Sequence, residues 1–396
     1  MTTKTSRKLR MGMVGGGPGS FIGDVHVKAA QFDGGVEMVA GAFSSTRAKS
    51  EERGRQLYLD PGRVYGSHEE MIERERRLPD GERIDFVSIV TPNHLHYPAA
   101  RDFLNAGFHV VCDKPMTFTL QEARALRTLV RRKSKLVFAL THNYTGYPMV
   151  KLARDLVGRK RLGRVLKVVV QYPQGWLIER IEKAGSKQAE WRTDPRRAGK
   201  AGAMGDIGTH AANLVEYITG LGITELCADL ASVIPGRNLD DDGNCLLRFN
   251  SGARGVLIAS QVSAGELNGL RIRVYGEKGQ LHWRQETPET LDFATCDGCV
   301  TTYRRGTAAI APLSPAAAAA TRIPFGHPEG FYEAFATIYK NAVDTIRAKR
   351  EGLKPSAINL DFPNVDDGVR GMEFIETVVR SGKLRRWVKW FEGGQP

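Results

Sequence analysis

The sequence AGAMGDIGTHAANL, residues 201–214, places a carboxylate and an imidazole four positions apart, at Asp206 and His210. The stretch predicts a helix over 206–219, and residues i and i+4 share one face of a helix. A histidine titrates near neutral pH and can transfer a proton, while a neighbouring carboxylate can orient its ring. Taken singly, Asp206 would be a helix cap and His210 a buried core histidine. Together they are candidates for acid–base catalysis.

A second candidate site lies near the amino end, where an apolar strand over 8–14 runs into GGGPGSFIGDVH. Gly15 and Gly17 match the first two positions of G-x-G-x-x-G, and Gly23 is the displaced third glycine. Glycines in this loop allow a tight turn and a close approach to a pyrophosphate, and the following helix N-terminus favours anions. The stretch therefore predicts a dinucleotide-binding loop.

Strands and helices alternate along the first 140 residues. The strands are expected over 36–43, 63–65, 84–90, 109–112 and 135–140. This alternation predicts an α/β Rossmann domain, a doubly wound parallel sheet whose ligands bind at the carboxyl ends of its strands. The loops TPNHLH and DKP fall at such ends, so cofactor contacts are expected from Thr91, Pro92, Asn93, His96, Asp113 and Lys114.

Cofactor choice should be encoded after the second strand. An acid there would hold the ribose 2′-hydroxyl of NAD, but this chain has Ser44, Ser45 and Arg47 instead. Hydroxyls and a guanidinium can accept a 2′-phosphate, which leans towards NADP. The serines can equally bond an unphosphorylated ribose, and Arg47 is as readily a solvated residue at a helix start.

The pattern changes in the second half. Alternating strands are expected over 165–172, 246–249, 256–262, 270–275 and 280–283, and helices over 206–219, 332–349 and 366–381. Short turns between the strands favour antiparallel neighbours, so an α+β domain with an open, mainly antiparallel sheet follows. The stretch 307–330 is expected to be a surface loop that can act as a lid. The domains are thus expected to be 1–142, binding dinucleotide, and 143–396, binding substrate.

Composition narrows the class of protein. The 396 residues carry a formal net charge of +13, but the basic residues are scattered and form no nucleic-acid module. No apolar run is long enough for a membrane span and no secretory leader precedes the glycines, so the cytoplasm is expected. Neither Cys296 with Cys299 nor His94 with His96 has the further ligands of a metal site, and no metal is expected.

The ordered set of motifs resembles the Gfo/Idh/MocA family of oxidoreductases over nearly the whole chain. Asp113-Lys114-Pro115 resembles the family's Glu-Lys-Pro, and Asp206 with His210 its Asp-x-x-x-His. The pair Trp191-Arg192 and the segment Asn143-Tyr144 also match, although Thr145 replaces a common arginine. The resemblance implies an NAD(P)-dependent dehydrogenase or reductase that acts on a secondary carbinol of a sugar, glycoside or cyclitol. It also implies a homodimer or homotetramer formed through the second domain's sheet.

Hydride transfer from a carbinol requires a base for the hydroxyl proton and a group that stabilises alkoxide character. We expect His210 to be the acid–base, Asp206 its orienter, and Lys114 the partner of the reacting oxygen beside the nicotinamide. Asn143 is expected to contact the cofactor. The expected substrate residues are Lys114, Asp206, His210, Tyr144, Tyr172, Trp176, Trp191, Arg192 and His327, although the aromatic ones are equally compatible with core packing.

Three alternatives remain open from the sequence. An enzyme that keeps its nucleotide bound would epimerise a sugar or cleave a glycoside through a keto intermediate, with no net reduced cofactor. A dinucleotide and sugar sensor would bind without turnover, although an intact set of Lys114, Asp206 and His210 argues against it. A nucleic-acid binder would show strongly salt-dependent binding to duplex.

Overall fold

The computed structural model describes residues 7–390 and resolves them into two compact units. The first unit contains residues 7–117, 121–143 and 331–368, and the second contains 118–120, 144–330 and 369–390. Residues 331–368, expected in the second domain, therefore pack with the first unit. The functional division at residues 142 and 143 stays a prediction.

The first unit is built on a five-stranded parallel sheet with the order β2-β1-β3-β4-β5, as the α/β prediction requires. Its strands are β1 Leu9–Gly15, β2 Val36–Ala42, β3 Phe86–Val90, β4 His109–Cys112 and β5 Phe138–Leu140. Every residue of β3, β4 and β5 is buried, which explains their continuous apolar sequences.

The expected strand over 63–65 is wrong. Residues Pro61–Arg63 form a 3₁₀ turn, η1, and Val64 makes only an isolated bridge to Gly41. The Asp60 side chain accepts a hydrogen bond from the Gly62 amide at 2.8 Å, and proline has no amide proton to contribute to a strand. A turn therefore replaces the strand.

Helices cover both faces of this sheet. They are α1 Phe21–Gln31, α2 Arg47–Gln56, α3 His68–Arg77, α4 His96–Asn105, α5 Leu120–Arg132 and α12 Phe331–Arg350. Met11 and Met13 of β1 pack in one core cluster with α1 and α12, whereas Gly12 between them faces Met71 of α3. None of the helices within residues 7–390 combines the length and apolar character that a membrane crossing requires.

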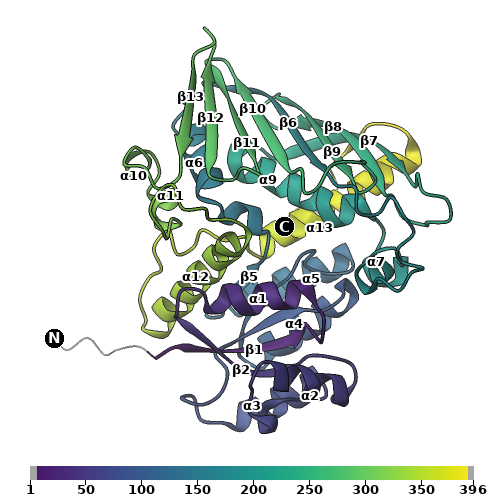
Figure 1. Ribbon diagram of the computed structural model, residues 1–396, viewed down its shortest axis with the longest axis vertical. Coiled ribbons are helices and arrows are strands. Elements are labelled where there is room, and N and C mark those ends of the chain that lie inside the picture. The colour runs from purple at the N-terminus through teal and green to yellow at the C-terminus, as the bar shows by residue number, and fades with distance from the viewer. Residues whose placement is uncertain (1–6, 391–396) are drawn as a thin grey trace. The chain divides into compact units, whose positions relative to one another are not determined.

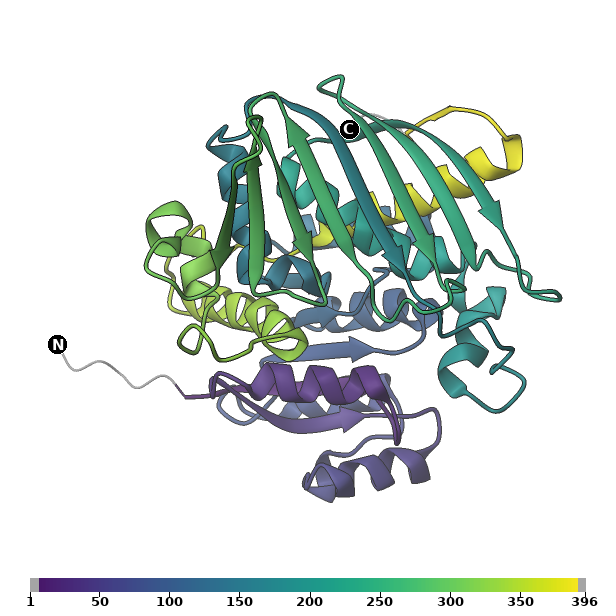
Figure 2. The same ribbon diagram turned by 45° about the horizontal axis from the view of Figure 1, so that its top comes forward.

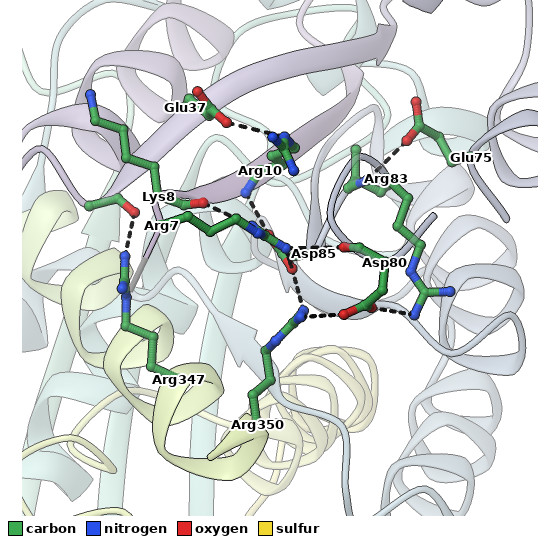
Figure 3. Close-up of polar contacts among 12 residues, drawn as sticks. Arg7, Lys8, Arg10, Glu37, Glu75, Asp80, Arg83, Asp85, Arg347 and Arg350 are labelled. Atoms are coloured by element: carbon green, nitrogen blue, oxygen red, sulfur yellow. Dashed lines mark hydrogen bonds and ion pairs between the residues drawn. The ribbon is translucent and has the colours of Figure 1, made fainter. Parts of the chain in front are cut away.

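Helix α12 belongs to the first unit because its apolar face completes that core. It lies beside α1 (Figure 1). Phe331 of α12 stacks on Phe21 of α1. The last turn of α12 is held by ion pairs to Asp85, a carboxylate whose side chain is 1% exposed (Figure 3). Asp85 also accepts hydrogen bonds from the Arg7 guanidinium at 2.6 and 2.9 Å. These contacts fasten the amino end of β1 to a helix more than 300 residues away.

The second unit is built on a nine-stranded mixed sheet with the order β13-β12-β11-β10-β6-β9-β8-β7-β14 (Figure 2). Neighbours are antiparallel except β6 and β9, which confirms a mainly antiparallel sheet. The strands are β6 Val165–Pro173, β7 Ile223–Ala231, β8 Asp242–Phe249, β9 Arg254–Ser260, β10 Arg271–Gly276, β11 Gly279–Arg284, β12 Thr290–Thr295, β13 Val300–Arg304 and β14 Val388–Lys389.

Helices α6 Pro148–Gly158 and α9 Thr209–Thr219 pack against each other and against this sheet. The long helix α13 runs over Val365–Leu384. The stretch 307–330, expected to be a surface loop, instead carries two short helices, α10 Ile310–Leu313 and α11 Pro315–Ala319. Ile310 and Ala317 are buried, because α10 and α11 pack on α6. A lid role for this stretch stays a prediction.

Candidate active site

The glycine loop of the first unit has the backbone that its sequence requires. Gly15 and Gly16 have φ angles of +85° and +71°, a region that favours glycine. A Cβ at Gly23 would lie 2.6 Å from the Gly16 Cα, so this third glycine lets α1 approach the loop. Ser20 caps α1 by accepting a hydrogen bond from the Gly23 amide at 3.1 Å. A helix N-terminus thus directly follows the loop that opens at Gly15 and Gly17.

The residues after β2 are less well arranged to bind a phosphate. Ser44 is half-buried, whereas Ser45 and Arg47 are exposed. Arg47 donates through Nη2 to Oε2 of Glu70 at 2.6 Å, and the Gly66 amide donates to the same oxygen at 2.8 Å. The hydrogen bond from Arg47 lowers the pKa of Glu70, so this carboxylate is charged at neutral pH. Arg47 is therefore already neutralised by a partner.

A buried polar atom at the carboxyl end of β3 fits a polar ligand. Thr91 follows β3, and its Oγ1 atom makes no hydrogen bond among the described residues. Leaving such an atom buried without a partner is costly, at about 1–3 kcal/mol. Thr91 was expected to contact the dinucleotide, whose polar groups would satisfy it. Asn143, which was also expected to contact the dinucleotide, is buried after β5.

His96 connects two of the predicted loops. It is buried, and its Nε2 and Nδ1 lie 2.8 and 2.7 Å from the carbonyl oxygens of Thr91 and Pro115. Burial lowers the pKa of His96, although both carbonyls oppose that shift. Pro92 precedes the short 3₁₀ turn η2 Asn93–Leu95, in which Asn93 is buried. Within residues 7–390 no group of three or more histidine, cysteine or acidic side chains is arranged to hold a metal.

The Asp113-Lys114-Pro115 turn follows β4. Asp113 Oδ1 accepts hydrogen bonds from the Lys114 amide and the Thr141 hydroxyl, both at 2.8 Å. Burial by itself raises the pKa of Asp113, but His26 and Lys114 outweigh it and hold that pKa below its usual range. The aspartate that replaces the family's usual glutamate is thus a charged group built into the turn.

Asp206 is not the helix cap that its position suggested. The expected helix over 206–219 instead begins with a π-helical turn, η4 Met204–Gly208, which leads into α9. The carboxylate of Asp240 accepts hydrogen bonds from the amides of Gly202 and Met204 at 2.7 and 2.8 Å. Asp240 therefore caps this turn. Single π turns are frequent at functional sites.

Two side chains hold the Asp206 carboxylate. Its Oδ2 accepts from Arg192 Nε at 3.2 Å and from Gln261 Nε2 at 2.9 Å. The Arg192 guanidinium lies over the Trp191 ring at 4.2 Å and the Trp176 ring at 6.0 Å. The predicted residues Trp176, Trp191, Arg192 and Asp206 are therefore brought together. Gln261 was missed because nothing local in the sequence marks the end of β9.

His210 is buried against aromatic and polar groups of the second unit. Its ring and the Tyr144 ring pack edge to face, with centroids 4.9 Å apart. The hydroxyls of Tyr144 and Tyr172 are hydrogen-bonded to each other. Burial raises the pKa of both tyrosines, so they stay protonated. Tyr172 donates to Asn268 at 2.8 Å, a second residue that the sequence did not single out. His327 is exposed.

Comparisons with known proteins bear directly on these motifs. Residues 9–141 match the oxidoreductase family with an NAD-binding Rossmann fold, and residues 150–282 match the GFO/IDH/MocA C-terminal domain. An uncharacterised oxidoreductase of Bacillus subtilis (strain 168) is 32% identical over 97% of this chain and 98% of its own. A levoglucosan dehydrogenase of Pseudarthrobacter phenanthrenivorans is 27% identical over 96% of this chain and 98% of its own.

Solved structures give the same result. An inositol dehydrogenase homolog of Azotobacter vinelandii, solved with NAD⁺, is 34% identical and superposes with a TM-score of 0.91 over 97% of this chain and 98% of its own. The same homolog has been solved with NADH and myo-inositol. This homolog and a levoglucosan dehydrogenase were both solved with NAD(H), and the lean towards NADP finds no support in them. The chain belongs to the Gfo/Idh/MocA family of NAD(P)-dependent oxidoreductases.

Proposed function

We propose that this protein is an NAD-dependent dehydrogenase that oxidises one secondary hydroxyl of a cyclitol or sugar-like polyol. The observation that carries the proposal is the set of hydrogen bonds around Asp206. Its carboxylate is released from helix capping by Asp240 and is held by Arg192 and Gln261 one turn before His210. A purely structural aspartate would have no need of that arrangement.

The surroundings of His210 suit a polyol. Tyr144 and Tyr172 offer hydroxyls, and Asn268 and Gln174 offer amides joined by a 2.8 Å hydrogen bond. Such groups exchange hydrogen bonds with hydroxyls without requiring a charged substrate. The inositol dehydrogenase homolog and the levoglucosan dehydrogenase, solved with myo-inositol and levoglucosan, support the same class of substrate.

Roles follow from these chemistries. His210 takes the hydroxyl proton, and Asp206 orients its ring. Lys114 hydrogen-bonds the same oxygen and stabilises its developing negative charge. A bound NAD would supply the hydride acceptor. The glycine loop at Gly15 and the Thr91 hydroxyl would hold NAD(H), with Asn143 as a further expected contact. A homodimer or homotetramer stays a prediction.

The test mixes purified protein with NAD or NADP and a panel of inositols, pyranoses and anhydrosugars. Reduced nicotinamide is followed by absorbance, and nucleotide binding is measured separately by calorimetry. His210→Ala and Lys114→Ala are compared with His282→Ala, which changes a histidine on β11 of the second unit. We expect turnover with NAD and one polyol, lost about 100-fold or more in the first two variants only.

Other outcomes discriminate the alternatives. Substrate conversion without added nucleotide and without net reduced nicotinamide would indicate the recycling enzyme. Nucleotide and sugar binding with no conversion of either would indicate a sensor. Full activity in both His210→Ala and Lys114→Ala would overturn the residue assignment, whatever the reaction proves to be.

A further inference from the structure

A buried polar cluster lies in the first unit among the apolar residues of its core. It consists of His26 on α1, Ser88 on β3 and Tyr339 on α12, here called the His26 cluster. The three residues are 0%, 0% and 1% exposed. Phe335 packs on the His26 ring with centroids 5.2 Å apart. Polar groups so deeply buried are retained only where they have partners or a role.

The hydrogen bonds of the His26 cluster form a chain from Ser88 through Tyr339 to His26. His26 Nδ1 lies 2.6 Å from the Tyr339 hydroxyl, which lies 2.7 Å from Ser88 Oγ. On the other side of the ring, Nε2 lies 3.8 Å from Asp113 Oδ1. A carboxylate can only accept, so the proton is assigned to Nε2 and Nδ1 accepts from Tyr339. Ser88 then donates to Tyr339.

The cluster meets the Lys114 turn at a single atom. Asp113 Oδ1, which faces His26, is also the acceptor for the Lys114 amide. The separation of 3.8 Å is too long for a hydrogen bond, so the imidazole acts on the carboxylate by electrostatic attraction. The position of the His26 ring therefore bears on the carboxylate that fixes the backbone of Lys114.

One atom of the cluster shows that it is not arranged for stability alone. His26 Nε2 is fully buried and has no hydrogen-bond partner among the described residues. An apolar side chain at this position would avoid such an unsatisfied donor and would pack on Phe335 equally well. Cores carry unsatisfied polar atoms mainly where function requires them.

We infer that His26 is a positioning residue for the Lys114 turn, held in place by Tyr339 and acting through Asp113. The inference rests on the proposed function, since it gives Lys114 a role in the reaction. It also gives α12, which packs in the first unit through its apolar face, a further role: this helix supplies the hydroxyl that orients His26. The sequence separation of His26 and Tyr339 is 313 residues.

The test uses the full chain with three variants. His26→Leu removes the ring polarity, and His26→Gln restores a donor near the position of Nε2. His109→Leu is the matched control. His109 is also a buried histidine, but it lies at the amino end of β4, whereas the Lys114 turn follows the carboxyl end of that strand. Hydrogen exchange of the Lys114 amide is measured by mass spectrometry, and steady-state kinetics are measured with NAD and the active polyol.

The inference expects the Lys114 amide of His26→Leu to exchange about tenfold faster, with unchanged exchange in His109→Leu. It expects kcat to fall about tenfold to hundredfold at a nearly constant KM for NAD, with His26→Gln recovering most of the loss. Unchanged exchange in His26→Leu would overturn it, and so would faster exchange with unchanged kcat. If no substrate is turned over, the proposed function fails separately, and the exchange result alone decides whether His26 positions this turn.

Discussion

Arg47, the first residue of α2, donates to Glu70 of α3 at 2.6 Å. A guanidinium at this place in a dinucleotide-binding domain is the expected partner of a 2′-phosphate. Here a carboxylate already neutralises it, and Glu70 is itself fixed by the Gly66 amide. This arrangement favours a nucleotide without the extra phosphate.

The first prediction concerns Glu70→Ala. Removing the carboxylate frees Arg47, and the ratio of kcat/KM for NADP to that for NAD should rise about fivefold, because the guanidinium can then pair with the 2′-phosphate. Glu69→Ala is the matched control, since it removes the same charge one residue away on α3. An equal rise in both variants would mean that net charge, and not the release of Arg47, sets the preference.

The second prediction separates Asp206 from Asp240. Asp206→Asn should lower kcat about 100-fold with little change in thermal midpoint, because Asp206 does not cap the turn that carries it. Asp240→Ala should lower the midpoint by several degrees, since two amides of that turn lose their buried acceptor at a cost of about 2 kcal/mol. Calorimetry and kinetics on both variants check this. If Asp206→Asn and Asp240→Ala lowered the thermal midpoint equally, Asp206 would have a structural role.

Much of the fold could be predicted because its information is local. The continuous apolar run over 84–90 identifies a buried strand, and Gly15, Gly17 and Gly23 mark a loop between a strand and a helix. The expected strand over 63–65 failed because Asp60 and Pro61 favour a turn, a preference stronger than a three-residue alternation. Strands β7, β12, β13 and β14 were missed. Much of β7, β12 and β13 is half-exposed or exposed, which weakens the apolar pattern, and β14 has only two residues.

The parts that could not be predicted depend on contacts between distant residues. The amphipathic pattern of α12 shows that the helix buries one face, but not which core receives it. The residues that hold Asp206 come from other elements, Arg192 from α7 Lys187–Arg192 and Gln261 from the end of β9. Ser88 was the one visible clue to the His26 cluster, as a hydroxyl within a strand that is otherwise apolar.

The third prediction concerns Asp85, the centre of the ion cluster in Figure 3. Its buried carboxylate accepts from the Arg10 amide at 2.7 Å and from the guanidinium groups of Arg7 and Arg350. Asp85→Ala should lower the free energy of unfolding in urea by about 3 kcal/mol, the usual effect of breaking a buried pair. Arg77→Ala, in an exposed pair with Glu73, should change it by less than about 0.5 kcal/mol. Equal values for both variants would contradict a structural role for the cluster.

The fourth prediction is that His109 makes the protein less stable in mild acid. Burial, reinforced by Lys349 and Arg350, lowers the pKa of His109 to about 4, against an ordinary value of 6.5. The unfolded chain then binds the proton that the folded chain refuses, so stability is complete above pH 6.5 and falls as the pH drops towards 4. Between pH 7.5 and 5 this residue should cost about 2 kcal/mol of unfolding free energy.

Urea unfolding at the two pH values, in wild type and His109→Asn, isolates that contribution. An asparagine oxygen can still accept the hydrogen bond that His109 Nδ1 now accepts from the Val137 amide at 2.8 Å. The variant should therefore keep its fold at pH 7.5 and lose about 2 kcal/mol less than wild type on acidification. His142, whose pKa burial lowers to about 3, continues to contribute equally to both proteins and cancels in the comparison. Identical losses in the two proteins would show that His109 is protonated within the folded state at pH 5.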